Sequence, residues 1–274
     1  SGSGITGPTL CDFGKLPEVK EIKGIRKRLA EAGPDLEATL ELFKSLKIPN
    51  FQRETEYISL KSREEYALYD GVIASTDAGT TPVENYRHWT NEYLVPQSTA
   101  KYAKNVRDSF MVGALARFNN NHEQLSPGAK KAARELGLKA PSYNPFMNNV
   151  AQVVEIVHAV EESIRLIDEL LNKGLKEEDR RILLKAGHGA GAVDVPRGIL
   201  FHEYTYDKNG ICMEANCIIP TNQNHANIQK DMEALLPHLL DKPKEEIALN
   251  LEMLVRAYDP CISCSTHLLK VKFV

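Results

Sequence analysis

The chain has 274 residues, a hydrophobic fraction of 42%, a charged fraction of 26% and a formal net charge of -3. These values are ordinary for a globular protein, and the length allows a large core in one domain or two. The small net charge gives no electrostatic reason to expect binding to nucleic acid or to an acidic membrane surface, and no apolar run approaches the roughly 18 residues that cross a bilayer.

The first quarter of the chain predicts two helices and then two short strands. Apolar residues recur at helical spacing over residues 17–46, with a break at Gly33, and Asp35 is the expected N-cap of the second helix. Residues 56–60 and 66–73 have the composition of β strands separated by charged turns.

The middle of the chain predicts short helical pieces and then one long helix. A helix is expected near Val83, mixed structure over 98–116, a polar turn at 119–122 and a short helix from Pro127.

The longest regular element is expected over residues 145–172, where valine, isoleucine and leucine form a broad apolar stripe. At about 1.5 Å per residue such a helix spans roughly 40 Å, so we expect it to be the central helix of a bundle. His158 lies close to the apolar stripe, and we interpret it as a core histidine rather than a metal ligand.

The second half of the chain predicts a β hairpin followed by two helices. Residues 186–191 are rich in glycine, so backbone could approach a ligand there, but the run is not a dinucleotide-binding fingerprint. Residues 199–206 and 211–219 flank an Asn-Gly turn and predict the hairpin. Helices are expected over 227–240 and 243–257.

The five cysteines indicate a reducing compartment. They are Cys11, Cys212, Cys217, Cys261 and Cys264. An odd and sparse set in a chain of this size is not typical of a disulfide framework. We therefore expect a cytoplasmic protein in which closely spaced thiols serve metal or redox chemistry.

Cys261 and Cys264 form a Cys-x-x-Cys motif that directs both sulfurs into one small volume, where a soft metal ion can bind them. Three interpretations remain open from the residues alone: a structural zinc site, a redox-active dithiol, and a metal centre completed by ligands from elsewhere. Cys212 and Cys217 are five residues apart on a predicted strand, so their side chains point to opposite faces and cannot bind one ion together.

Arg197 and Asp259 are the charged candidates. Arg197 stands between Pro196 and Gly198, an arrangement that can present a guanidinium to a small anion or an open metal site, although a surface arginine at a turn has the same pattern. Asp259 lies two residues before Cys261 and either pairs with an arginine or caps a turn.

Several stretches, in the same order along the chain, resemble motifs of the large subunit of nickel–iron hydrogenases, in particular its cytoplasmic, cofactor-linked branch. They are residues 259–267 (Asp-Pro-Cys-Ile-Ser-Cys-Ser-Thr-His), 195–198 with His202, 219–224, 111–117 and 144–148. The resemblance runs from about Glu56 to the end of the chain. It implies a mainly α fold with small β hairpins, a helical bundle around a long central helix, and one domain over residues 1–274 equivalent to the C-terminal two-thirds of such a subunit.

The resemblance also implies metal ligands. Cys261 would be a terminal thiolate on nickel, and Cys264 would bridge nickel and an iron that carries carbon monoxide and cyanide ligands. His267 and the carbonyl oxygen of Cys217 would bind magnesium or a similar divalent ion. Soft thiolates suit nickel and iron, whereas a hard ion takes carbonyl oxygen and imidazole.

The resemblance implies roles for four further residues and a reaction. Arg197 would lie over the open nickel–iron position and assist heterolytic cleavage of H2, with Asp259 holding it. Thr221, with the backbone around Pro196 from Val195 to Arg197, would hydrogen-bond the cyanide ligands. Electrons would pass to an iron–sulfur small subunit and then to electron-acceptor subunits.

The chain departs from the family pattern at both ends. The family's N-terminal R-x-C-x-x-C motif is absent, and Cys11 lacks its context, so another chain or segment would supply the other two thiolates. Residues 1–15 predict a flexible lead without a secretory signal. Residues 268–274 correspond to a tail that many family members lose by cleavage.

Two rival functions follow from the missing thiolate pair. The chain could be a non-catalytic scaffold of the same fold, like the related subunit of respiratory complex I, although retention of Cys261, Cys264 and Arg197 argues against this. The other rival is a zinc-stabilised helical protein, which would contain zinc and no diatomic ligands.

Overall fold

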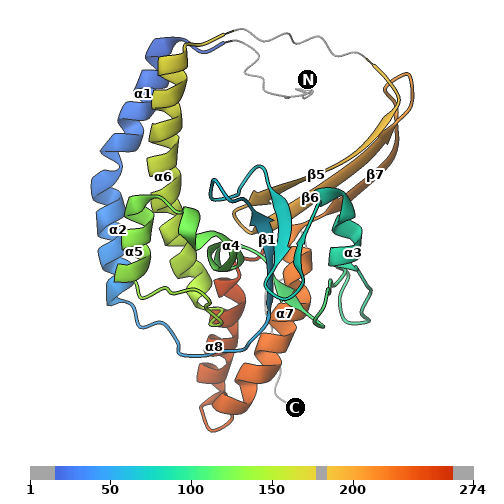
Figure 1. Cartoon of the computed structure of the whole chain (residues 1–274). Helices are drawn as coiled ribbons and strands as arrows, with labels where there is room; N and C mark the ends of the chain where they lie inside the picture. Colours follow the sequence, from blue (N-terminus) through green and yellow to red (C-terminus); the bar gives the residue numbers. More distant parts are fainter. Residues whose placement is uncertain (1–15, 177–183, 262–274) are drawn as a thin grey trace, which may run out of the picture.

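The structure, a computed structural model, describes residues 16–176 and 184–261 (Figure 1). The helices are α1 (Val19–Glu31), α2 (Gly33–Ser45), α3 (Tyr86–Thr90), α4 (Ala114–Asn121), α5 (Pro127–Glu135), α6 (Met147–Lys173), α7 (Pro220–Leu235) and α8 (Lys244–Ala257). The strands are β1 (Glu56–Lys61), β2 (Val72–Ser75), β3 (Gly79–Thr81), β4 (Phe110–Met111), β5 (Gly187–Val195), β6 (Gly198–Tyr206) and β7 (Cys212–Ile218). Helices with two small sheets confirm the predicted fold class. No helix in these ranges combines the length and hydropathy that a membrane crossing requires.

The strands form two sheets. The first has the order β3-β2-β1-β4, with β1 antiparallel to β2 and parallel to β4. The second has the order β5-β6-β7 and is antiparallel throughout. The pairing of β6 with β7, which sets His202 opposite Cys217, confirms the predicted hairpin. Gly210 has a φ of 77° in its turn, a conformation that glycine adopts without strain.

A buried apolar cluster joins the two sheets. It includes Ile58 of β1, Phe110 of β4, Ile199 and Phe201 of β6, and Ile218 of β7. A larger cluster lies among the helices α4 to α8 and the neighbouring strand β1. Because β4 leads directly into α4, the sheet-to-sheet cluster fixes the start of β6 relative to α4 (Figure 1).

α6 confirms the predicted long helix, with 27 residues. Its N-terminal half is buried against α4 and α5, whereas its C-terminal half continues beside α1 (Figure 1). His158 is 5% exposed, and its Nδ1 accepts a hydrogen bond from the Ser126 N–H at 3.1 Å. Burial lowers the pKa of His158, so the imidazole is a neutral acceptor there, as the interpretation of a core histidine requires.

The glycine-rich run is a strand, which was not predicted. β5 pairs with β6 along its whole length, from Gly187 opposite Tyr206 to Val195 opposite Gly198. Glycine has a low intrinsic preference for strands. The pairing partner, rather than local composition, therefore fixes this strand.

Three predicted boundaries were wrong. α7 begins at Pro220 rather than at residue 227, because proline at the first position of a helix already has the required φ. The N-cap of α2 is Ala32, so Asp35 lies inside the first turn. Only the end of the predicted strand 66–73 is extended, since β2 begins at Val72.

The polar stretch at 119–122 was also misassigned, because α4 continues through Asn121 and a 3-10 turn follows. The side-chain amides of this stretch hydrogen-bond to other parts of the chain. The Asn121 side chain donates to the Leu60 carbonyl at 2.9 Å, and the Asn119 side chain donates to the Ser142 carbonyl at 3.0 Å. Neighbours distant in sequence therefore stabilise a helix whose composition suggests a turn.

Candidate metal centre

Three segments that are distant in sequence meet around four residues: Arg197 in the β5–β6 turn, Thr221 at the start of α7, and Asp259 and Cys261 after α8. Arg197 Nε donates to the Asp259 carbonyl oxygen at 2.8 Å. The Cys261 N–H donates to Thr221 Oγ1 at 3.1 Å. We call Arg197, Thr221, Asp259 and Cys261 the site cluster.

Asp259 holds the Arg197 guanidinium through both its backbone and its carboxylate. Arg197 Nε lies 3.4 Å from Asp259 Oδ2, with 43% and 38% of the two side chains exposed. Gln152 of α6 donates to the same oxygen at 3.3 Å. Ion pairs at such exposure contribute little to folding stability, so the effect of these contacts is to orient the guanidinium. Asp259 has a φ of 49°, which turns the chain sharply between α8 and Pro260.

The turn that carries Arg197 is closely packed against the loop before α4. Gly113 has a φ of 117°, and a Cβ there would lie 3.2 Å from the Arg197 carbonyl oxygen. Gly198 has a φ of 135°, and a Cβ there would overlap the side chain of Val112. Both positions need glycine, because a side chain would push the turn away from α4.

Thr221 lies 3% exposed in the first turn of α7, directly after Pro220. Its hydroxyl oxygen accepts from Cys261, and a hydroxyl has one further hydrogen to donate. The next residues of α7 hydrogen-bond to β6 and to the loop before α4. Gln223 donates to the Ile199 carbonyl at 2.7 Å, and Asn224 exchanges two hydrogen bonds with the backbone of Val112. The start of α7 is therefore fixed to β6 and to the loop before α4.

Buried polar side chains also hold the end of α8 in place. Asn148 of α6 donates to the Ala257 carbonyl at 2.8 Å. Asn227 of α7 donates to the Tyr258 hydroxyl at 2.7 Å, and that hydroxyl donates to Asp231. Burial raises the pKa of both Tyr258 and Asp231. Because Tyr258 immediately precedes Asp259, these bonds set the position from which the site cluster begins.

A match to the family model for nickel-dependent hydrogenases covers residues 49–267. The chain belongs to the nickel-dependent hydrogenase family. It is 34% identical to sulfhydrogenase 1 subunit alpha of Pyrococcus furiosus, over 96% of this chain and 61% of that protein. It is 29% identical to sulfhydrogenase 2 subunit alpha of the same organism, over 94% of this chain and 60% of that protein. The chain thus spans about 60% of the length of these hydrogenase subunits.

The fold agrees with the family. The structure superposes on an NAD+-reducing NiFe hydrogenase, solved in the H2-reduced state, with a TM-score of 0.75 and 24% sequence identity. The match covers 92% of this chain and 61% of that chain. At this identity the likeness shows the fold alone, which is that of a nickel–iron hydrogenase large subunit.

The described residues supply part of the donor set that this family implies. A thiol suits nickel and iron. Cys261 provides one at the site cluster, beside the Arg197 guanidinium and the buried Thr221 hydroxyl. Cys264 and His267 lie outside the described residues, as do Cys11 and the segments 1–15 and 268–274. Within residues 16–176 and 184–261, no three His, Cys, Asp or Glu side chains group as a metal site.

Cys217 contacts a histidine of the neighbouring strand. The residue is exposed on β7, and its thiol lies 3.2 Å from Nε2 of His202 on the neighbouring strand. Desolvation of the thiol by the surrounding atoms raises its pKa. The magnesium role predicted for its carbonyl oxygen stays a prediction. Cys212 lies on the same strand, and its thiol donates to the Glu214 carbonyl at 3.3 Å.

The sequence analysis gave no role to six residues that support the site cluster, although four of them lie in the stretches 111–117, 144–148 and 219–224 that resemble family motifs: Gly113, Arg117, Asn148, Gln152, Asn224 and Asn227. One signal was present. Arg117 follows an apolar stretch, Met-Val-Gly-Ala-Leu-Ala, and a charge in such a stretch must be either exposed or paired when buried. The structure shows that Arg117 is 0% exposed and paired.

Proposed function

We propose that the chain is part of a hydrogenase catalytic subunit, and that it contributes to a nickel–iron centre catalysing reversible heterolytic cleavage of H2 to protons and electrons. The observation that carries this proposal is the convergence of Arg197, Thr221, Asp259 and Cys261 in a member of the nickel-dependent hydrogenase family. These are the residues in which the sequence resembles the family's motifs. Their roles below are inferences from their chemistry and position.

In this proposal Cys261 and Cys264 would hold the nickel–iron centre through their thiolates. When bound, the centre supplies the redox-active metals at which H2 is split. A cysteine sulfur takes up and releases protons near neutral pH, whereas a guanidinium stays charged. We therefore assign Cys261 Sγ as the atom that takes the proton, and Arg197 as the fixed positive charge that stabilises negative charge developing beside it.

Asp259 and Thr221 would orient the other groups. Asp259 is a positioning residue because it binds Arg197 through backbone and carboxylate. Thr221 and the backbone N–H groups beside Pro196, such as that of Arg197, would hydrogen-bond cyanide ligands on iron, because proline itself has no N–H. The Thr221 hydroxyl can donate while it accepts from Cys261. His267 and the Cys217 carbonyl would hold magnesium or a similar ion.

The proposal implies partners. An iron–sulfur small subunit would receive the electrons, because the few cysteines of this chain cannot hold both a cluster and the nickel–iron centre. Another chain or segment would supply the other two thiolates, since the related subunits extend well beyond the part this chain matches. Further subunits would pass electrons to an acceptor in the cytoplasm.

The test is metal content and activity of the complex purified through this chain. The wild type should contain nickel, should contain more iron than nickel because the clusters of the small subunit also hold iron, and should reduce a viologen dye with H2. Cys261→Ser should lose nickel and activity, because a serine hydroxyl is a poor ligand for a soft metal. Cys212→Ser, a thiol on β7, is the matched control and should retain both.

Two outcomes would count against the proposal. Nickel and activity retained in Cys261→Ser would remove this thiol from the centre. A wild-type complex that lacks nickel but keeps its partner subunits and their cluster iron would favour the non-catalytic scaffold, and zinc bound to this chain would favour the zinc-stabilised protein.

A further inference from the structure

Arg117 is a fully buried arginine whose five N–H groups all have an acceptor. It lies on α4, in the core between Ala116 and Phe118, and is 0% exposed. Nε and Nη2 donate to the two carboxylate oxygens of Glu155 at 2.6 and 2.7 Å, and Nη1 donates to Asp194 Oδ1 at 2.6 Å. The two remaining N–H groups donate to backbone. A guanidinium has five N–H donors, so the set is complete.

The two backbone acceptors immediately precede Arg197. Arg117 Nη1 donates to the Val195 carbonyl at 2.7 Å, and Nη2 donates to the Pro196 carbonyl at 2.9 Å. The next carbonyl, that of Arg197, lies against Gly113, where a Cβ would be 3.2 Å away. Two successive carbonyl groups are therefore held by hydrogen bonds from α4, which fixes the peptide planes on both sides of Pro196, and the third lies close against Gly113.

The two carboxylates attach Arg117 to distant elements. Glu155 lies on α6 and also accepts from the Tyr66 hydroxyl at 2.7 Å. Asp194 lies on β5 and also accepts from the Leu60 N–H of β1 at 2.8 Å. The side chain of Arg117 therefore links the β5–β6 turn to α4, α6 and β1.

A buried ion pair is by itself weak evidence for a stabilising role. Removing an ion from water costs several kcal/mol, and well-packed apolar residues of similar volume often stabilise a fold as well as a buried ion pair does. An apolar side chain at position 117 would, however, leave the Val195 and Pro196 carbonyls without their donors. The guanidinium fixes the orientation of these two carbonyl groups and therefore of the turn.

We propose that Arg117 is a positioning residue that aligns the β5–β6 turn so that Arg197 meets Asp259. It acts on the turn through the backbone carbonyls of Val195 and Pro196. The alignment itself is independent of any metal. Its consequence for catalysis rests on the proposed function.

The first test uses Arg117→Lys in the full chain and measures hydrogen–deuterium exchange of peptides covering residues 195–199. Lysine keeps the charge but has donors at one point only, so it cannot bind two carboxylates and two carbonyls at once. We expect exchange in 195–199 to rise about tenfold while the β6–β7 hairpin stays protected. Arg53→Lys is the matched control: Arg53 is also paired, with Asp231 and Asn227, but not with the turn. It should leave exchange in 195–199 unchanged.

A second variant keeps the test decisive if Arg117→Lys does not fold. Glu155→Gln retains an acceptor and the volume of the side chain but removes one charge from the pair, and should raise exchange in the same segment by a smaller factor. Unchanged exchange in 195–199 in a folded Arg117→Lys chain would overturn the proposal. So would an equal rise over the whole chain in both variants, because that result describes a loss of stability only.

The second test uses the metal-loaded complex. Arg117→Lys should lower kcat for H2-dependent dye reduction by about 10- to 100-fold, the effect of a displacement of roughly 1 Å, with little change in KM. It should also shift the infrared bands of cyanide, because the Arg197 N–H proposed to bind that ligand belongs to the same peptide as the Pro196 carbonyl that Arg117 holds. A positive exchange result with no metal in the complex would leave Arg117 as a positioning residue and remove the proposed function instead.

Discussion

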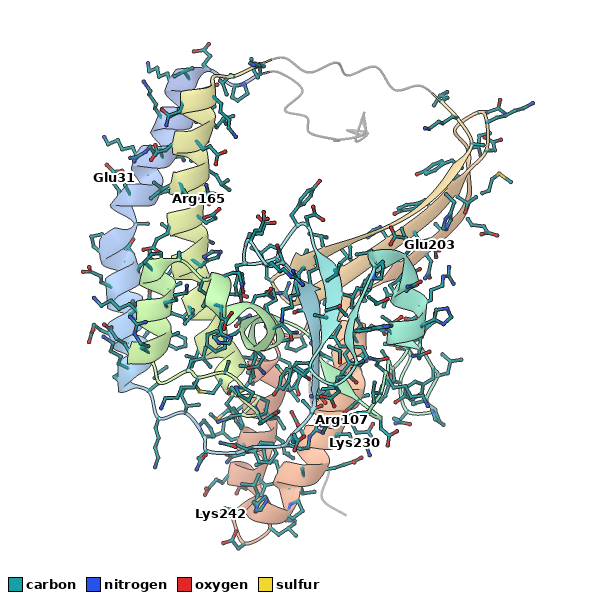
Figure 2. The ribbon with its side chains drawn as sticks, viewed as in Figure 1. Glu31, Arg107, Arg165, Glu203, Lys230 and Lys242 are labelled. Atoms are coloured by element: carbon teal, nitrogen blue, oxygen red, sulfur yellow. The ribbon has the colours of Figure 1, made fainter. Side chains whose placement is uncertain are left out.

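The junction around the site cluster and the paired helices α1 and α6 are built in different ways. At the junction, buried side chains such as Arg117, Asn148 and Asn227 bind backbone and side-chain groups from other elements. Where α1 runs beside the second half of α6, the polar contacts are exposed ion pairs. Arg26 binds Asp168, and Arg165 binds neighbours on its own helix. Arg165 and Glu31 lie on these two helices, away from the junction (Figure 2).

The contacts between α1 and α6 hold two helices together, whereas those at the junction also fix the directions of particular groups. An apolar stripe with exposed charges tolerates small shifts, because neither depends on an exact direction. A buried hydrogen bond does depend on direction, and a buried group left without a partner destabilises the fold. The directional contacts concentrate where Arg197, Asp259 and Cys261 must meet. Substitutions in the two regions should therefore have unlike effects.

The largest effect should come from Asn227→Ala. The Asn227 side chain accepts from Arg53, Thr55 and Ser109 and donates to Tyr258, so its loss leaves several buried groups without a partner. We expect the free energy of unfolding to fall by about 2–4 kcal/mol, measured by urea denaturation.

Asn250→Ala is the control for that substitution. Asn250 lies on α8, and its side chain bonds only within its own helix, to the Glu246 carbonyl. It should change the free energy of unfolding by less than about 0.5 kcal/mol. Equal losses of unfolding free energy in the two variants would mean that the buried hydrogen bonds at the junction stabilise the fold no more than an exposed one does.

An intermediate effect, of opposite sign in the two regions, should come from replacing glycine with alanine. Gly113→Ala places a Cβ 3.2 Å from the Arg197 carbonyl at a φ of 117°, and should lower the free energy of unfolding by about 1–3 kcal/mol. Gly24→Ala, inside α1 with nothing within 4 Å of the new Cβ, should raise it by up to about 1 kcal/mol. Thermal and urea unfolding of both variants would check this. The same sign in both would contradict the comparison.

The smallest effect should come from Arg165→Ala on α6. Its partners Glu162 and Glu169 are on the same exposed helix, and solvent screens such pairs. We expect the unfolding midpoint to stay within experimental error and its dependence on salt concentration to be slight. A clear fall in the midpoint would show that this region also depends on specific polar contacts.

Much of the fold could be predicted because its signals are local. The apolar stripe of α6 and the turn at Gly210 are readable within one element. β5 could not be predicted, since its glycines carry no strand preference and only the facing strand β6 makes it extended. The start of α7 at Pro220 depended on a proline that both ends a strand and begins a helix.

At the site, residues with distinctive sequence context were predictable and their supports were not. Arg197, between proline and glycine, and Asp259, before Pro260, stood out in the sequence, and the structure brings the two together. Their roles stay predictions. Arg117 and Gln152 act on that pair from α4 and α6, and nothing near them in sequence reports which turn or carboxylate they contact. Such contacts are fixed by tertiary packing alone.

The most direct test of the central claim is infrared spectroscopy of the complex purified through this chain, in the window where metal-bound carbon monoxide and cyanide absorb. We predict bands in the wild type that shift under H2, that behave in the same way in Cys212→Ser, and that move and lose their response to H2 in Cys261→Ser. An empty window in a complex that retains its iron–sulfur subunit, or bands unaffected by the loss of the Cys261 thiol, would contradict a nickel–iron centre at the site cluster.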